Sequence, residues 1–416
     1  MTTVATTLAE WAAGFEASDD DLALAHRSLL DTMAVAHAAR SHPLNPLFER
    51  LNRAGELAAL AHVLDFDDLH MPSTAHISAI CVPVALTTNG GARAYLAGAG
   101  VMARLGLALG WRHYTAGWHA TCTAGAPAAA AAAAVARQLD AERIATAMTL
   151  AIPAAGGIQR AFGTSAKALQ VGFAADAGVR AAELADAGAT ADLAALDEWM
   201  RLIGGNPDAI PKDDPAVPGG LAIKLHPCCY ALQRPIAAVA SLGRIRAEDV
   251  RHVRIATPAG SLKPLIHSRP TTGLEGKFSL EYAVAAYLLD GRAEVESFTD
   301  AAVKRGAVRE LMDKIQVEPV DNADEGLLAG LVRVELRTSD GRIRSAELDL
   351  PPGAPQRPPT QEELRGKLEA CAGPAADELA ALTWQTAASW VTAPSSETAP
   401  SSETAASWKT ARAKAP

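Results

Sequence analysis

The 416-residue sequence has no excess of positive charge. It contains 38 lysines and arginines against 47 aspartates and glutamates, so its formal net charge is −9. No basic stripe with interleaved aromatic residues occurs along it, although nucleic-acid-binding surfaces carry such stripes. We therefore expect no nucleic-acid partner. An anionic small substrate stays open, because a few basic groups inside a pocket act more strongly than the global charge.

Cysteines are few and show no disulfide spacing. The five are Cys81, Cys122, Cys228, Cys229 and Cys371. This usage is typical of a reducing compartment. The N-terminus lacks the Lys/Arg-rich start of a signal peptide, and the longest uncharged run, 114–136, is too rich in alanine and glycine to span a membrane. We expect a cytoplasmic protein without a membrane partner.

Several nucleotide and catalytic motifs are also missing. The sequence has no P-loop, no G-x-G-x-x-G fingerprint, no G-x-S-x-G elbow and no H-E-x-x-H zinc motif. Hydrophobic residues make up 49% and charged residues 20%, a composition typical of a well-buried globular enzyme. These features predict chemistry carried out by side chains, without a cofactor.

The pattern of apolar residues predicts a mainly α protein. Residues 1–220 and 360–390 are assigned to a large all-helical domain rich in alanine and leucine. Ser18 or Asp19 is expected to cap one helix, and Thr360 with Glu363 forms a capping box for another. The predicted helices in this part cover 18–39, 128–140, 141–152, 166–188, 190–203 and the segment after Thr360.

A Pro/Gly/Asp-rich linker, 204–220, separates this part from a smaller α+β lid domain, 221–351. Strands are predicted at 250–258 and 315–319, and a hairpin at 330–350 turns at Asp340-Gly341 with type I′ geometry. Helices are expected at 279–291 and 299–314. The repeated Ser/Thr/Pro/Ala composition of 391–416 predicts a flexible low-complexity tail.

Lys167 is a solitary charge in the alanine-rich stretch "AFGTSAKALQVGFAADAG". Thr164 or Ser165 is a good N-cap, which places Lys167 in the first turn of a helix. The positive end of the helix dipole and partial burial would both lower the pKa of this lysine. Such a lysine suits proton transfer or carboxylate binding, whereas an exposed structural lysine is the plain alternative.

The segment "LDFDDLHMPSTAHIS" gathers Asp65, Asp67, Asp68, His70 and His76 within apolar surroundings. Carboxylates and imidazoles this dense suit acid–base catalysis or a divalent metal. No further cluster completes a metal site, so the sequence favours no metal. The alternative is a capped loop in which the aspartates act as N-caps.

Two other segments contain candidate groups. His119 stands before an alanine helix in "GWHATCTAGAP", where a histidine is either a titrating group or a structural one. "KLHPCCYALQRP" contains Lys224, His226, Cys228 and Cys229. Adjacent cysteines rarely bind one zinc ion together, and a nucleophilic cysteine beside a histidine stays open as an alternative to buried structural cysteines.

Together, "DFDDLHMPSTAHIS", "GWHATCTAGAPAAAAAAA", "GTSAKALQVGFAADAG", "KLHPCCYALQRP" and "GLEGKFSLEYAVAAYLLDGR" resemble the MmgE/PrpD family in content and order. That family includes 2-methylcitrate dehydratase, cis-aconitate decarboxylase and iminodisuccinate epimerase. The resemblance implies a helical domain with an α+β lid, a homodimer, and an active site between the domains. It also implies cofactor-free chemistry at a carbon next to a carboxylate of a small carboxylic acid.

Residue by residue, the resemblance implies catalytic roles for Asp65, His76, His119 and Lys167. It implies substrate-binding roles for Lys224, His226 and Cys229. In this hypothesis His119 or Lys167 removes the proton, and Asp65 orients His76, which protonates a leaving hydroxyl or the opposite face.

Three positions depart from decarboxylase-like members: Leu69 replaces threonine, Ile77 replaces proline and Cys229 replaces histidine. A dehydratase is therefore the leading expectation. The alternatives are an epimerase, a decarboxylase, or a helical binding protein without activity.

Overall fold

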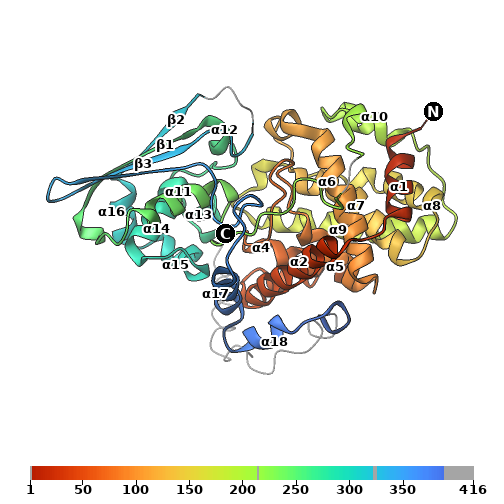
Figure 1. Cartoon of the computed structure of the whole chain (residues 1–416), viewed down its shortest axis with the longest axis horizontal. Helices are drawn as coiled ribbons and strands as arrows, with labels where there is room; N and C mark the ends of the chain where they lie inside the picture. The colour runs from red at the N-terminus through yellow and green to blue at the C-terminus, as the bar shows by residue number, and fades with distance from the viewer. Residues whose placement is uncertain (1, 213–214, 322–325, 388–416) are drawn as a thin grey trace, which may run out of the picture.

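The computed structural model describes residues 2–212, 215–321 and 326–387 (Figure 1). The mainly α fold class is confirmed, with one small sheet beside a large helical part. The predicted tail at 391–416 lies outside the described residues. The helical part contains α1 (Val4–Gly14), α2 (Asp19–Ala38), α3 (Asn45–Phe48), α4 (Arg53–Val63), α5 (Ser78–Thr87), α6 (Gly91–Thr115), α7 (Ala120–Ala136), α8 (Ala141–Leu150), α9 (Ser165–Asp186) and α10 (Ala195–Leu202).

The helix caps follow the sequence closely. Ser18 and Asp21 form a capping box at the start of α2, and Thr164 caps α9 by accepting the N–H of Ala166. The helix predicted from residue 128 is the second half of α7, which begins eight residues earlier at Ala120. Small side chains let α7 pack closely against α6 and α9, and α7 is buried along almost its whole length.

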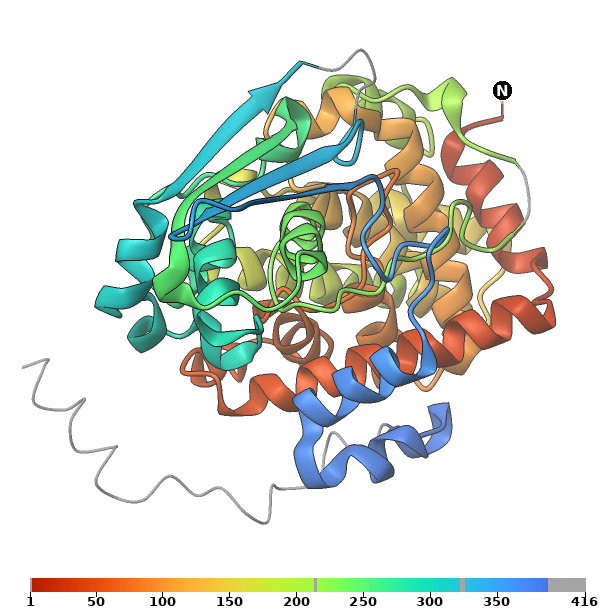
Figure 2. The same ribbon diagram turned by 60° about the vertical axis from the view of Figure 1, so that its left-hand side comes forward.

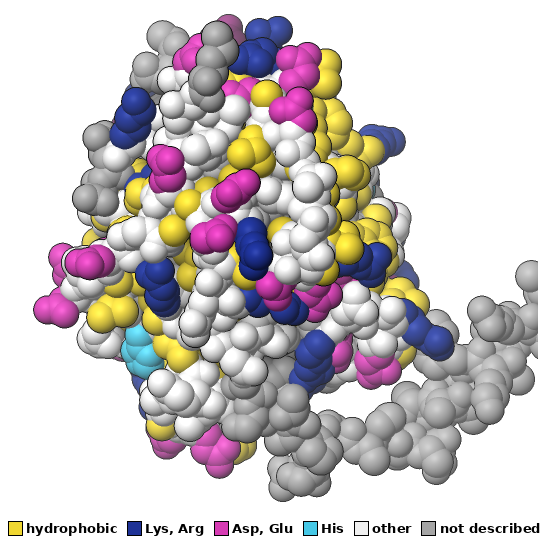
Figure 3. Space-filling model, turned by 90° about the vertical axis from the view of Figure 1, so that its right-hand side faces the viewer, with side chains coloured by type: hydrophobic (Ala, Val, Ile, Leu, Met, Phe, Trp, Pro, Cys, Tyr) yellow, Lys and Arg dark blue, Asp and Glu magenta, His cyan; other side chains and the backbone are white. Residues whose placement is uncertain are grey.

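Helix α6 alone in the described part of the chain is long and apolar enough to cross a membrane. Of its most apolar 18-residue window, 83% is buried inside the fold. The helix therefore serves as a core element here. At the end of the molecule that carries α1, α8 and α10, basic and acidic side chains lie interspersed (Figure 3).

The lid contains a four-stranded sheet of order β2-β1-β3-β4. Strand β1 (Val250–Pro258) runs parallel to β2 (Ile315–Val320) and antiparallel to β3 (Val332–Thr338), which pairs with β4 (Ile343–Leu348). One face of β3 is buried in strict alternation. The lid helices are α11 (Tyr230–Ser241), α12 (Ala259–Leu262), α13 (Gly273–Gly276), α14 (Leu280–Asp290), α15 (Asp300–Val303) and α16 (Gly306–Met312).

The hairpin turn forms at the predicted place, but its predicted type is wrong. A type I′ turn needs positive φ at both central residues, whereas Gly341 has φ 82° and Asp340 is not among the positive-φ residues. The N–H of Gly341 donates to Thr338 O at 3.0 Å. The turn therefore comprises the four residues 338–341 and ends on Gly341 in the left-handed conformation. Within it, Asp340 Oδ1 accepts from the Thr338 hydroxyl at 2.6 Å.

Helix α17 (Gln361–Ala372) begins at the predicted Thr360–Glu363 capping box and returns to the helical part. It lies along α2, and α18 (Ala376–Ala380) follows it (Figure 2). Two hydrophobic cores result, one in the helical part and one under the sheet. Leu69 and Phe162 come from the helical part but belong to the core under the sheet. These two residues join the halves around the candidate site.

Candidate active site

The loop after α4 places the first candidate carboxylate. Asp65 follows the helix end with φ 51°, a left-handed conformation that aspartate tolerates better than most residues. Buried lysines from the C-terminal half hold this loop by its main chain. They donate to three consecutive carbonyl oxygens, each at 2.8 Å: Lys277 to Leu64, Lys224 to Asp65 and Lys367 to Phe66.

The Asp65 carboxylate lies among cationic and imidazole groups. Its Oδ1 is 2.7 Å from Lys224 Nζ, 3.4 Å from Lys167 Nζ and 3.8 Å from His76 Nε2. Burial alone would favour the neutral acid, but Lys167 and Lys224 outweigh it and hold the pKa of Asp65 well below its usual range. Asp65 is therefore ionised at neutral pH.

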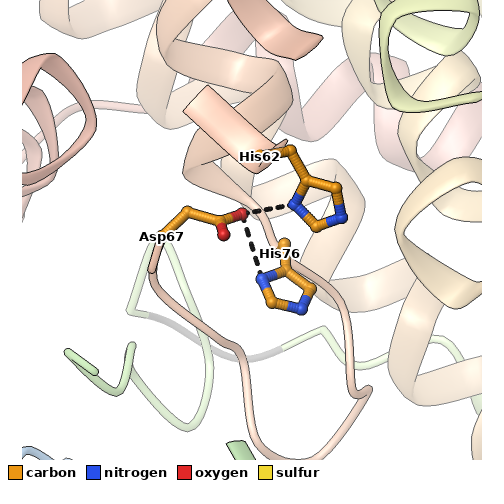
Figure 4. A group of neighbouring side chains, drawn as sticks. All are labelled: His62, Asp67 and His76. Carbon is orange, nitrogen blue, oxygen red and sulfur yellow. Dashed lines mark hydrogen bonds and ion pairs between the residues drawn. The ribbon is translucent and has the colours of Figure 1, made fainter. Parts of the chain in front are cut away.

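Asp67 joins two histidines of the site (Figure 4). Its Oδ2 accepts from His62 Nδ1 at 2.7 Å and lies 3.0 Å from His76 Nδ1. Burial opposes the charge on Asp67, yet the two imidazoles lower its pKa well below the usual value. Burial lowers the pKa of His76 to about 3, so that imidazole is neutral. Asp67 lies closer to the His76 ring than Asp65 does, at 3.0 Å against 3.8 Å, although its contact with Nδ1 is not aligned as a hydrogen bond.

His62, Asp67 and His76 form the one group of potential metal ligands found in the described part of the chain. The His62–Asp67 contact of 2.7 Å is a hydrogen bond. Two ligands of one tetrahedral ion, each roughly 2.1 Å from it, would stand roughly 3.4 Å apart. His62 Nε2 also lies 2.6 Å from the ammonium nitrogen of Lys167. As arranged, the three residues fit hydrogen bonding better than a metal ion.

Lys167 and His119 complete the cluster. Lys167 lies in the first turn of α9 as predicted, is 6% exposed, and contacts His62 and Asp65. His119 directly precedes α7, and its ring lies 5.7 Å from that of His62. Its Nδ1 contacts Gln170 Nε2 at 2.7 Å, while its Nε2 has no hydrogen-bond partner in the described structure. Burial and nearby Lys167 lower the pKa of His119 well below its usual value.

These groups line two small adjoining cavities, of about 20 Å³ and about 10 Å³. Asp65, Lys167 and Phe278 line both. The first is also lined by Leu69, Thr74, His76, Tyr114, His119, Phe162, Cys229, Tyr230, Pro264 and Leu327. The second is also lined by His62, Val63, Gly163, Thr164, Ala168, Leu274 and Lys277. Acid–base groups and apolar walls thus enclose one site between the halves.

The three predicted substrate-binding residues are placed differently from one another. Cys229 lines the first cavity, and burial raises the pKa of its thiol to about 12, so it is protonated. Lys224 is fully buried and directs its ammonium to Asp65. His226 lines neither cavity, because its Nδ1 lies 3.1 Å from Ala293 O within the lid. The structure therefore does not bring His226 to the site.

Three residues of the cluster were not predicted from the sequence: His62, Lys277 and Gln170. Asp67 was named in the polar segment but was given no role of its own. Asp67 belongs to the DFDD segment, and His62 precedes it near the end of α4, after the apolar run 57–61. Gln170 lies three residues after Lys167, on the same face of α9. Burial lowers the pKa of Lys277 to about 8. Helical spacing from Lys167 could have indicated Gln170. Nothing in the sequence shows which residues His62, Asp67 and Lys277 contact.

A mainly helical protein with an α+β lid and a buried cluster of aspartates, histidines and lysines matches a known class of enzymes. The MmgE/PrpD N-terminal domain model matches residues 53–204, and the MmgE/PrpD C-terminal domain model matches residues 226–390. The chain belongs to the MmgE/PrpD family.

Curated relatives are cis-aconitate decarboxylases. The protein of Aspergillus terreus is 28% identical over 293 residues, which cover 63% of this chain and 59% of the relative. The human protein is 26% identical over 287 residues, which cover 65% of this chain and 58% of the human protein. The mouse protein is 26% identical over 271 residues, which cover 61% of this chain and 55% of the mouse protein. The chain thus matches less than two thirds of the length of these relatives.

Proposed function

We propose that this protein is a cofactor-independent lyase for a small di- or tricarboxylic acid. The reaction would remove a proton next to a carboxylate and eliminate water. One observation carries the proposal: two neutral imidazoles, His76 and His119, line a buried cavity together with Asp65 and Lys167. An elimination needs one group that accepts a proton and one that donates a proton, and two imidazoles can supply both.

The charges of the site favour an anionic substrate. Lys167, Lys224 and Lys277 contribute three ammonium groups, and the ionised side chains of Asp65 and Asp67 offset two of them. Lys277, with a pKa of about 8, is mostly protonated at neutral pH. The start of α9, beside Lys167, adds the positive end of the helix dipole. A substrate carboxylate entering the cavity would therefore meet net positive charge.

Decarboxylation is the second candidate, and two observations favour it. The relatives compared are cis-aconitate decarboxylases. The cavity wall also has aromatic and apolar side chains that would disfavour a hydrated carboxylate: Phe162, Phe278 and Leu327. Leu69 and Cys229, the two cavity positions that depart from decarboxylase-like members, support elimination as the first candidate.

Proton NMR in heavy water tests the proposal, using citrate-, methylcitrate-, aconitate-, tartrate- and aspartate-derived acids as substrates. Elimination would produce an alkene, decarboxylation an acid with one carboxylate fewer, and epimerisation a diastereomer. Any of these, with exchange of the α-proton, identifies the reaction. Absence of exchange and product across the panel would contradict the proposal and favour a binding protein.

Replacing Lys167 by Met tests the site itself. The change leaves His62 Nε2 without its partner and removes one cation from Asp65. We expect turnover to fall by about 100-fold or more, with an unchanged circular dichroism spectrum. Lys304→Met, at an exposed lysine, is the matched control and should keep full activity. Undiminished activity of the Lys167→Met variant would contradict the assignment.

We further propose a cytoplasmic homodimer. All five cysteines are free and buried, which suits a reducing compartment. Phe173 and Leu184 are 54% and 48% exposed and lie three turns apart on α9. An exposed apolar face of this kind suits contact with a second copy of the chain.

A further inference from the structure

The environment of His119 determines which of its ring nitrogens carries the proton. His119 directly precedes α7, and its main-chain N–H donates to Gly157 O at 2.9 Å. Gln170 approaches from α9, with its Nε2 2.7 Å from His119 Nδ1. The role of that contact depends on how the Gln170 amide is oriented.

The Ile158 main chain fixes this orientation. Its N–H donates to Gln170 Oε1 at 3.1 Å, and its carbonyl oxygen lies 3.5 Å from Gln170 Nε2. A main-chain N–H is only a donor, so the amide oxygen must face it. The amide nitrogen then faces His119. Because an amide nitrogen only donates, His119 Nδ1 must accept.

A second neighbour has the same effect. Cys122 Sγ lies 3.3 Å from His119 Nδ1. Burial raises the pKa of this thiol far above neutrality, so the sulfur carries its proton and can donate. With donors on Nδ1, the proton of the neutral ring is on Nε2. That nitrogen has no partner in the described structure, and His119, 2% exposed, lines the first cavity.

We propose that Gln170 is a positioning residue that holds His119 in the Nε2–H tautomer, so that His119 donates a proton to the substrate and does not remove one. The inference rests on the proposed lyase function. His76 takes the complementary role. Its Nδ1 lies 3.0 Å from the Asp67 carboxylate but is not aligned for a hydrogen bond. A proton on this nitrogen would face a group that only accepts, and we assign the lone pair to Nε2 on that ground.

In the proposed elimination the two imidazoles therefore have separate tasks. His76 Nε2 takes the proton from the carbon next to the carboxylate and leaves a carbanion, whose electron pair then forms the new double bond. The C–O bond breaks toward the leaving oxygen, and the Nε2–H of His119 transfers its proton to that oxygen. Water leaves, His76 ends as an imidazolium and His119 as an imidazolate, and proton exchange through solvent restores both to the neutral form.

The test is Gln170→Glu, read by long-range proton–nitrogen NMR on protein labelled with nitrogen-15 histidine. The spectrum of His119→Asn identifies the His119 signals. We expect the native protein to carry the proton on Nε2. In Gln170→Glu the carboxylate accepts from Nδ1–H, so the proton should move to Nδ1. Gln316→Glu, at an exposed glutamine that contacts Glu318, controls for the added charge and should leave the His119 signals unchanged.

Activity gives a second readout. Product formation by Gln170→Glu should fall by about 100-fold, while exchange of the α-proton with heavy water, which needs only His76, persists. A purely structural role for Gln170 would lower both together. Gln170→Met, which removes the polar contact without adding charge, should populate both tautomers.

A native spectrum with the proton on Nδ1, or an unchanged tautomer in Gln170→Glu, would overturn the proposal. The spectra need no substrate. A failure of the lyase assignment would therefore appear as a silent substrate panel with the Nε2–H signal intact.

Discussion

Three aspartates within four residues, Asp65, Asp67 and Asp68, have different environments and different properties. Asp65 faces lysines and Asp67 faces imidazoles, and both pKa values lie below the usual range. Within the described residues, Asp68 has neither a lysine nor an imidazole as a hydrogen-bond or ion-pair partner. It bonds the N–H and hydroxyl of Ser78, and burial raises its pKa to about 7. The first two are therefore charged parts of the site, and Asp68 supports the start of α5.

Asp68 predicts a specific dependence of stability on pH. Its folded pKa lies above the unfolded value of 3.8, so its stabilising effect is fully present below about pH 4 and is lost as the pH rises through about 7. For each pH unit gained in this window, the free energy of unfolding of the wild type falls by up to about 1.4 kcal/mol relative to that of Asp68→Asn. Urea unfolding of both proteins at pH 5 and pH 7 measures this difference. A difference that does not change with pH would contradict the assignment.

At the scale of elements, α7 and α9 hold the site because they approach closely. Gly178 of α9 lies against α7, where a Cβ atom would stand 2.3 Å from Ala129 Cβ and 2.6 Å from Ala130 N. The close approach brings His119 at the start of α7 within reach of Gln170 on α9. The glycine thus supports the geometry of the site from a distance.

Gly178→Ala should therefore destabilise the protein, although alanine is the better helix former. The gain in helix propensity is about 1 kcal/mol, whereas overpacking costs about 1–3 kcal/mol and the main chain of α7 cannot yield easily. Gly366→Ala in α17, where an added Cβ meets nothing within 4 Å, is the control and should stabilise by about 0.5–1 kcal/mol. Thermal and urea unfolding compare the two, and a stabilising Gly178→Ala would contradict the packing argument.

At the scale of the whole molecule, the site exists only when the two halves meet. The Asp65 loop comes from the helical part, and the lysines that hold its carbonyl groups come from the C-terminal half. Lys367, which also bonds Asp31 at 2.5 Å, connects α17 to α2 and to the same loop. Movement of the lid relative to the helices would therefore alter the site directly.

The proposed homodimer is tested by the double change Phe173→Glu with Leu184→Glu. Two carboxylates on an apolar contact face would lose their water on association, so dimerisation should weaken by about 100-fold or more. Sedimentation velocity over a range of concentrations measures this. Val320→Glu, at an exposed residue of the lid, is the matched control and should not alter the oligomeric state. An unchanged sedimentation coefficient for the double variant would place the interface elsewhere.

The sequence by itself determined helices α2, α8, α9, α14 and α17, the four strands, the caps at Ser18, Thr164 and Thr360, the position of the hairpin, and the family. It did not indicate α1, α4, α5, α6 or α11. These features depend on spacing and side-chain chemistry within a few residues, which a single chain records directly.

Tertiary structure decided the partners. It alone showed that Asp67 contacts His76, that Lys224 forms an ion pair with Asp65, and that His226 contacts the lid. It also brought Gln170 to His119 across 51 positions of the chain. Such contacts depend on how helices pack in three dimensions, and local periodicity carries no record of that packing.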